Sequence, residues 1–177
     1  MTQPELVIFL QQKCNGVSET LLHVSETMFW YKPTPEAWSI AENVQHLVQS
    51  ALPVVRLLNA QRQVLLERFG KTTAPSRSYE EVVLAYKTVL ATGVKASGNF
   101  LPQIAEEADQ KSLNNTFEQT NAALVESTSK WSEAELNEYI IPHPVLGSLT
   151  VREMLYFTAY HNQHHHEKIM FLSKLQF

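Results

Sequence analysis

Long segments of the chain repeat apolar residues at the spacing of an α-helix, and this pattern constrains the fold more than any other feature. From Glu5 to Met28, apolar side chains recur every three or four residues, which is the period of one helix face. Glycine, which would interrupt such segments, occurs only 5 times in 177 residues. We therefore expect a chain that is almost entirely helical.

Further helices begin at pairs of residues with capping-box spacing, in which each side chain can satisfy a free backbone N–H of the first turn. These pairs are Ser39–Glu42, Ser78–Glu81, Asn115–Glu118, Ser132–Glu135 and Thr150–Glu153. They predict long helices over residues 39–69, 78–97, 115–131 and 150–177, and a short helical turn after residue 132. Pro53 should kink the first of these, because it removes a backbone donor and crowds the preceding turn.

Long amphipathic helices with short connections predict an all-α fold, a four-helix bundle with short extra helical segments. The stretches "YKPTPEAW" and "YIIPHPVLGS" contain paired prolines and read as loops. No segment alternates convincingly enough to be a strand, with "YII" as the one exception considered. At this length we expect a single domain over residues 1–177.

Composition excludes several classes of function. The formal net charge is −4 and the basic residues form no run, which argues against nucleic acid as a partner. No apolar stretch approaches the roughly 20 residues that span a membrane, and no basic segment followed by an apolar run marks a signal peptide. We expect a cytoplasmic protein. The single cysteine, Cys14, excludes an internal disulfide and a cysteine-based zinc site, and should be a buried apolar residue.

The segment "YFTAYHNQHHHEKIMF" holds four of the seven histidines. His161 and His165 are four residues apart, so they share one helix face, and that face continues through Ile169. His166 lies about 140° from His161 at 100° per residue, so it should face solvent or another helix. His164 is intermediate.

Two imidazoles on an apolar face need partners, and a shared metal ion would satisfy both. The alternative is a pair of histidines at the edge of the core, bonded to hydroxyls or water. A metal also needs a third ligand from another helix. Periodicity does not choose among the candidates His23, His46 and His143.

Two stretches, "WSIAENVQHLVQS" and "HPVLGSLTVREMLYFTAYHNQHHHEKI", resemble the DinB-like superfamily, which includes the YfiT-type metal-dependent hydrolases. The resemblance implies a four-helix bundle that binds a divalent metal ion through His46, His161 and His165. His164 falls on a family position that is often histidine but is not a ligand.

The family members are metal-dependent hydrolases or transferases that use low-molecular-weight thiols. The resemblance therefore implies a small-molecule substrate, which could be such a thiol. For the cofactor we expect zinc or nickel before manganese or iron, since imidazole suits all of them, and for the assembly a homodimer. The alternatives are a non-catalytic, stress-response bundle that binds a metal or a small molecule, and a bundle whose histidines never meet a metal.

Other residues near these motifs have simpler roles. Glu42 and Glu153 are explained by helix capping, so neither is nominated as a general base. Trp38 should be an apolar anchor at a helix start, and Tyr160 faces about 100° away from His161. His143 should be structural, roughly 15–25 Å from the metal at 1.5 Å per helical residue.

Overall fold

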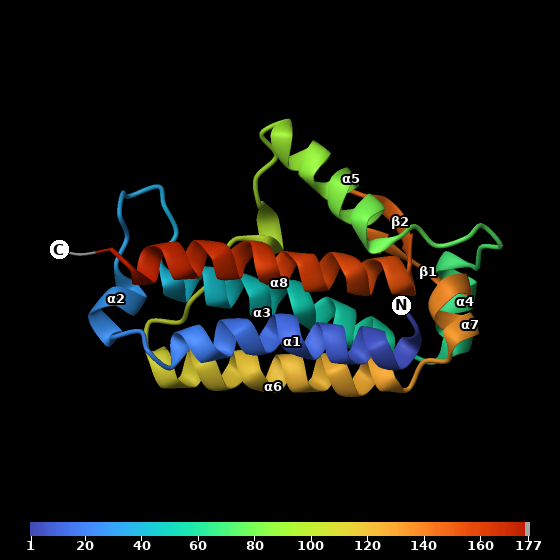
Figure 1. Ribbon diagram of the computed structural model, residues 1–177, viewed down its shortest axis with the longest axis horizontal. Helices are drawn as coiled ribbons and strands as arrows, with labels where there is room; N and C mark the ends of the chain where they lie inside the picture. The colour runs from blue at the N-terminus through green and yellow to red at the C-terminus, as the bar shows by residue number, and fades with distance from the viewer. Residues whose placement is uncertain (176–177) are drawn as a thin grey trace.

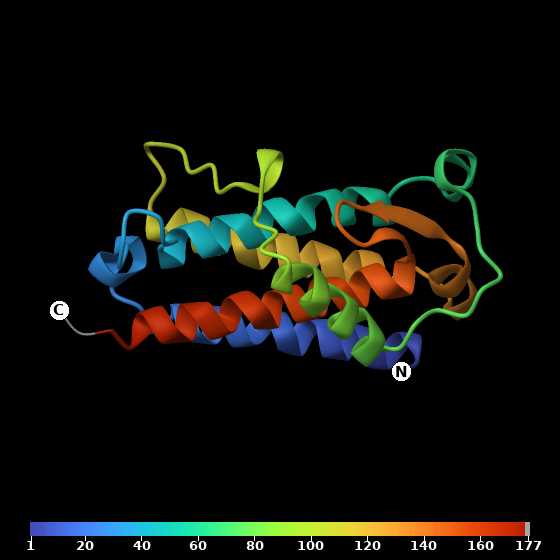
Figure 2. The same cartoon turned by 90° about the horizontal axis from the view of Figure 1, so that it is seen from above.

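The computed structural model of the protein describes residues 1–175, and its centre is a bundle of four long helices (Figures 1 and 2). The four helices are α1 (Gln3–Leu21), α3 (Ile40–Leu58), α6 (Gln110–Ser129) and α8 (Val151–Ser173). They form a closed square in which α1 contacts α6 and α8, and α3 contacts the same two helices. The views show α1 and α8 running in one direction, with α3 and α6 in the other. The predicted all-α four-helix bundle is confirmed.

Shorter elements close the bundle. At the end where α8 begins lie α4 (Arg62–Phe69), α7 (Glu133–Glu138) and a hairpin of β1 (Ile140–His143) and β2 (Gly147–Thr150). At the opposite end lies α2 (Glu26–Trp30). Figures 1 and 2 show α5 (Tyr79–Ala91) crossing α8 obliquely, followed by the short 3₁₀ helix η1 (Gly98–Phe100).

Four of the predicted capping boxes form. In each, the Ser or Thr side chain accepts from the backbone N–H three residues later, and the Glu side chain accepts from the cap's own N–H. These boxes open α3 at Ser39, α5 at Ser78, α7 at Ser132 and α8 at Thr150. The starts of these helices are therefore fixed by local sequence.

Several predicted helix boundaries are wrong. The helix expected over residues 39–69 divides into α3 and α4, because the Asn59 amide donates to the Val55 carbonyl and to Ser127 Oγ instead of allowing the helix to continue. Pro53 stays inside α3. The first helix stops at Leu21, and a new cap at Ser25 starts α2.

The two middle helices also differ from expectation. Helix α5 ends at Ala91 rather than near Ser97, because Gly93 adopts a φ of 84° that ends a helix. Helix α6 begins at Gln110, five residues before the predicted start, because the Asp109 carboxylate caps it by accepting from the Ser112 N–H at 2.6 Å. The last helix matches its prediction to Ser173, and residues 176–177 lie outside the described residues.

The stretch expected as a loop, "YIIPHPVLGS", instead forms most of an antiparallel β-hairpin. Ile140 pairs with Thr150 and His143 with Gly147. Gly147 has a φ of 74°, which a turn between such strands requires and other residues rarely adopt. Four-residue strands that contain a proline show too little alternation to be recognised from sequence.

The apolar core of the bundle consists of two separate clusters. One lies near the start of α8 and includes Leu10, Leu58 and Leu155, and the other lies near its end and includes Val44, Phe117 and Ile169. Several buried side chains that belong to neither cluster form a layer in the middle of the bundle: Cys14, His46, Ala51, Thr120, Asn121, Thr158, His161, Asn162 and His165. Most of this intermediate layer is polar, so the middle of the bundle is where chemistry can be placed.

None of the helices within residues 1–175 is long and apolar enough to cross a membrane.

His166, on the reverse side of α8, fixes the contact with α1. Its Nε2 lies 2.8 Å from Thr20 Oγ1. A Cβ atom at Gly16 would lie only 3.0 Å from Cε1 of this imidazole. Of the two alternatives expected for His166, solvent or another helix, the structure shows the second. Gly16 has no side chain, and this allows the imidazole to lie close to α1.

We predict that Gly16→Ala and His166→Ala are coupled in stability. In a His166→Ala background, Gly16→Ala should stabilise by about 1 kcal/mol, because alanine has the higher helix propensity. In the natural sequence, contact with the His166 ring should cancel or reverse that gain. Urea unfolding of the two single variants and the double variant measures the coupling. An equal effect of Gly16→Ala in both backgrounds would show that the ring does not press on this position.

Candidate metal centre

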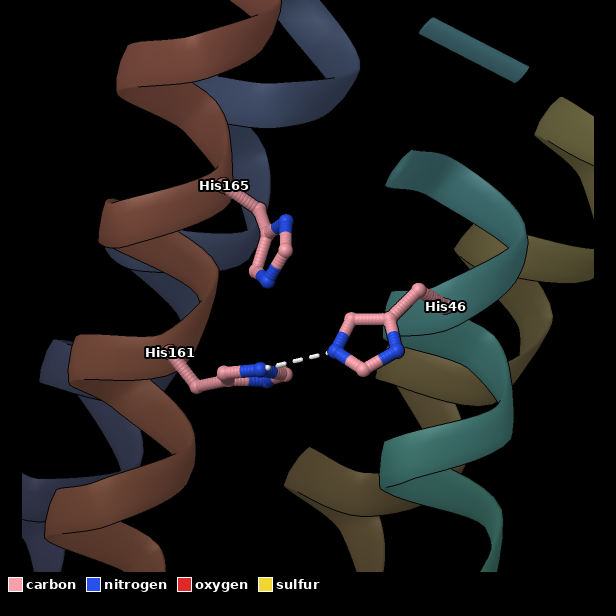
Figure 3. A group of neighbouring side chains, drawn as sticks. All are labelled: His46, His161 and His165. Carbon is pink, nitrogen blue, oxygen red and sulfur yellow. Dashed lines mark hydrogen bonds between the residues drawn. The ribbon is translucent and has the colours of Figure 1, made fainter. Parts of the chain in front are cut away.

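Three buried histidines from two helices meet in the middle of the bundle (Figure 3). His46 comes from α3, and His161 and His165 come from α8, with exposed fractions of 4–5%. One nitrogen from each ring lies within 4.8 Å of the other two. The closest pair is His46 Nε2 and His161 Nε2 at 3.1 Å.

Local sequence accounts for this convergence. His161 and His165 stand one turn apart on α8, whose register is set by the cap at Thr150. His46 lies two turns after the Ser39 cap of α3. Because α3 and α8 are in contact along the bundle, the three imidazoles face a common point.

Hydrogen bonds fix the tautomer of two of the rings. His46 Nδ1 lies 2.7 Å from the Phe100 carbonyl oxygen, which can only accept, so Nδ1 carries the proton. His165 Nδ1 lies 2.7 Å from Asn43 Oδ1. The Asn43 amide nitrogen donates to the Ser39 carbonyl at 2.8 Å, which orients the oxygen toward His165. Both Nε2 atoms are therefore unprotonated, and the lone pair of His46 Nε2 faces His161 Nε2 at 3.1 Å.

Burial keeps the cluster neutral. Desolvation lowers the pKa of His161 and of His165 well below 6.5, and the neighbouring imidazoles lower both further. Desolvation also lowers the pKa of His46, although the hydrogen bond to the Phe100 carbonyl opposes this. Neutral imidazole is the form that binds metal ions.

The geometry fits a divalent ion. Metal–nitrogen bonds of about 2.0–2.1 Å at tetrahedral or octahedral angles place neighbouring nitrogens about 2.8–3.4 Å apart. The His46 to His161 separation of 3.1 Å falls in this range, and the other pairs lie within 4.8 Å. A hydrogen bond between two of the rings would use only that pair, and would leave the His165 Nε2 lone pair without a donor.

Comparison with known sequences supports the assignment to a family. A sequence profile of the DinB superfamily matches residues 17–169, which include all three histidines. The chain belongs to the DinB superfamily. It is also 28% identical over 137 residues to YuaE, an uncharacterized protein of Bacillus subtilis (strain 168), and the matched region covers 76% of each chain.

Aromatic side chains surround the histidines of this DinB-superfamily protein. The Trp38 ring lies 4.9 Å from the His46 ring and stacks on His165 at 6.1 Å. Phe157 stacks on His161 at 5.2 Å, and Tyr86 of α5 lies 6.3 Å from the same ring. Trp38, expected to be an apolar anchor, is thus part of the wall of the site.

His143 lies closer to the cluster than the sequence suggested. Its ring is 4.2 Å from Phe157, which in turn is 5.2 Å from His161. Even added together, these two ring distances are shorter than the separation of at least about 15 Å that was expected between His143 and the metal. That expectation is wrong because the hairpin folds back along α8. His143 Nδ1 accepts from the Leu146 N–H at 3.1 Å, and burial lowers the pKa of this imidazole to about 4. Its role in the hairpin turn agrees with the structural assignment.

The remaining histidines and Tyr160 lie outside the cluster. His23 is exposed in the turn after α1, so it is not a third partner. His164 is half-buried and contacts Tyr160 and His165 at ring distances of 6.2 and 5.2 Å. His166 faces α1, as described above.

The carboxylates near the predicted motifs are already engaged. Glu42 caps α3 and pairs with Lys32 at 2.9 Å. Glu153 caps α8 and pairs with Arg77 at 3.0 Å, and these hydrogen bonds outweigh its burial and lower the pKa of the carboxyl group. Neither is free to act as a general base, as expected.

Cys14 is buried in α1, as predicted. Desolvation raises the pKa of its thiol to about 12, so it stays protonated near neutral pH. The side chain is therefore a core residue and not a nucleophile.

A larger hollow of about 1180 Å³ lies away from the histidines, at the end where α1 and α8 begin. Much of its charged lining is engaged in ion pairs or hydrogen bonds. Arg152 bonds to Glu133 and Asn137, and Lys71 pairs with Glu138 at 2.7 Å. The hollow is therefore separate from the histidines, and its buried arginine, Arg152, is already bonded to other residues.

Sequence reasoning missed two partners of the histidines. Asn43 lies three residues before His46, so the two share one face of α3. A polar residue on the same helix face as a candidate ligand was the signal that could have indicated its role. The Phe100 carbonyl carried no signal, because a backbone oxygen from a loop depends on tertiary structure alone.

We predict that the metal-free protein loses stability as the pH falls below about 6.5. The lowered pKa values of His161 and His165 mean that only the unfolded chain takes up protons there. Each residue should contribute up to about 1.4 kcal/mol per pH unit to the slope. Urea unfolding in chelator between pH 8 and pH 5 measures it. His165→Gln should make the slope shallower, and His23→Gln, an exposed position, should not. Equal slopes for the natural and His165→Gln proteins would contradict the buried, neutral assignment.

Proposed function

We propose that His46, His161 and His165 bind a divalent metal ion, zinc or nickel in the first place, and that the protein is a metal-dependent enzyme acting on a small molecule. The proposal is carried by one observation, the convergence of three neutral, buried imidazoles within 4.8 Å. Membership of the DinB superfamily supports it.

Three protein nitrogens would leave at least one coordination position for a substrate. A metal ion in such a site supplies Lewis acidity and lowers the pKa of a water or a thiol group. The chain's own contribution is to orient the ligands through Asn43 and the Phe100 carbonyl, and to exclude water with Trp38 and Phe157.

Of the two reactions, hydrolysis and thiol transfer, the placement of carboxylates favours thiol transfer. Hydrolysis usually needs a general base beside the attacking water. Glu42 and Glu153 are held by caps and ion pairs. A thiol has less need of such a base, because a metal ion bound there would lower its pKa so that it would lose its proton to solvent. We therefore propose a thiol-dependent transferase, with hydrolase activity as the second candidate.

Activity assays distinguish these reactions. Protein loaded with zinc or nickel should accelerate the displacement of chloride from 1-chloro-2,4-dinitrobenzene by a small thiol, and should do so more than it accelerates the hydrolysis of p-nitrophenyl acetate. The reverse ranking would favour the hydrolase. No acceleration of either reaction by metal-loaded protein would favour a non-catalytic binding bundle.

We predict that substitution of each of the three histidines by alanine removes most of the metal affinity. The loss should exceed the roughly 10–100-fold that an outer hydrogen bond contributes, because two imidazoles alone make a poor site. His164→Ala should have an intermediate effect through packing. His166→Ala and His23→Ala should retain affinity. Titration of the metal-free proteins with Co²⁺, followed by visible absorption, gives the dissociation constants.

The same titration tests two assignments separately: His46 as the ligand from outside α8, and His161 with His165 as the ligands on α8. Loss of Co²⁺ binding in His23→Ala, with binding retained in His46→Ala, would contradict the assignment of His46. Equal damage from His164→Ala and His165→Ala would contradict the assigned face of α8. Absence of Co²⁺ binding by the natural protein would overturn the metal site.

We predict that Asn43→Ala lowers metal affinity about 10–100-fold, because the oxygen that fixes the tautomer of His165 is lost. Asn43→Asp keeps an acceptor at the same place and should retain most of the affinity. The two variants share the loss of the amide donor to Ser39, so their comparison isolates the bond to His165. Equal affinities of Asn43→Ala and the natural protein would contradict this role.

A further inference from the structure

Lys168 lies on the same face of α8 as the two histidines of that helix. It follows His161 by seven residues, nearly two full turns, and His165 by three. Its positive charge lowers the pKa of His165, and also that of His46 on α3. The register of α8 therefore places Lys168 on the side of the helix that carries the two histidines.

Lys168 has no negative partner in the described part of the chain. None of the ion pairs within residues 1–175 includes it. The adjacent Glu167 accepts from Gln163 instead, at 3.1 Å. The residue reaches solvent, yet the surrounding protein desolvates the ammonium group and lowers its pKa. A partly desolvated, unpaired cation beside a candidate reaction site is available to a ligand.

A second lysine lies on α5. It is near the edge of the histidine cluster formed by His164 and Lys168, which we call the rim. Lys87 Nζ lies 5.6 Å from the centre of the Tyr160 ring, which is 6.2 Å from the ring of His164. The charges of Lys87 and Lys168 both lower the pKa of His164. The half-buried His164 therefore lies within reach of two ammonium groups.

The charge balance of this region favours anions. The three imidazoles of the cluster are neutral ligands, so a divalent ion bound there would keep both of its positive charges. Lys168 and Lys87 add two more. Glu167, beside Lys168, carries one negative charge that also acts on His164. Glu42 of α3 is paired with Lys32. This local excess contrasts with the formal net charge of −4 for the whole chain.

We infer that this rim selects small molecules that carry a carboxylate beside the group that reaches the metal, with Lys168 as the main anion-binding residue and Lys87 as the second. The inference rests on the proposed metal site and names the class of its substrate. It follows from the helix face that Lys168 shares with His161 and His165, from the contact of Lys87 with Tyr160, and from the lack of a carboxylate partner for Lys168.

Three ligands with the same metal-binding group and different tails test the inference by binding alone. Acetohydroxamate has a neutral tail, succinic monohydroxamate a carboxylate and β-alanine hydroxamate an ammonium group. Each is titrated into the Co²⁺-loaded protein and followed by visible absorption. The carboxylate ligand should bind roughly fivefold more tightly than the neutral one, the strength of a partly exposed charge pair, and the ammonium ligand more weakly than either.

Variants assign the preference to particular residues. Lys168→Gln should remove most of the carboxylate preference, with Co²⁺ binding and acetohydroxamate affinity unchanged, and Lys168→Glu should invert it in favour of the ammonium ligand. Lys87→Gln should have a smaller effect in the same direction. Lys111→Gln, at an exposed position on α6, is the matched control and should retain the full preference.

The outcomes separate the two proposals. If the natural protein binds no Co²⁺, the metal site is overturned and this inference falls with it. If it binds Co²⁺ and acetohydroxamate but the three ligands bind equally, the metal site stands and the inference is overturned. A carboxylate preference that survives both Lys168→Gln and Lys168→Glu would also overturn the role of Lys168.

Discussion

Three imidazoles in the middle of a helix bundle can be accommodated only if they are neutral and hydrogen-bonded, and the structure around them is organised by that requirement. Desolvation lowers the pKa values of His161 and His165, so protonation in the folded state is opposed. The Asn43 side-chain oxygen then accepts a hydrogen bond from Nδ1–H of His165, and the Phe100 carbonyl oxygen accepts one from Nδ1–H of His46. What remains is the Nε2 lone pair of His46, 3.1 Å from His161 Nε2, and that of His165, which accepts no hydrogen bond from the described residues, an arrangement that a cation would relieve.

The bundle provides this arrangement by interrupting its own core. Two apolar clusters hold the ends of the four long helices together, and the polar layer lies between them. Helix α8 passes through both clusters, with His161 and His165 on its inner face and His166 against Gly16 of α1 on its reverse face. The contacts with α1 and α3 therefore determine the rotation of α8, and with it the direction of the two histidines. Above them, Trp38 and Tyr86 come from segments outside the four-helix core.

Local sequence was sufficient to predict the helical class, the caps at Ser39 and Thr150, and the shared face of His161 and His165, because each depends on spacing within one helix. The choice of His46 required resemblance to a family, since periodicity did not separate it from His23. The break at Asn59 and the position of His143 were not predictable in this way. The first depends on a contact with Ser127 from another helix, and the second on a hairpin that folds back over Phe157.

The central claim is that the three histidines form the inner coordination shell of a divalent ion. X-ray absorption at the metal edge of protein purified without a nickel column tests it most directly. We expect three imidazole nitrogens at about 2.0–2.1 Å, together with at least one further light atom, in the ligand-free protein. Absence of the outer-shell scattering of imidazole would contradict the histidine ligands. A protein sulfur at about 2.3 Å would contradict them too, because the only cysteine, Cys14, is buried in α1 and is not part of the proposed site.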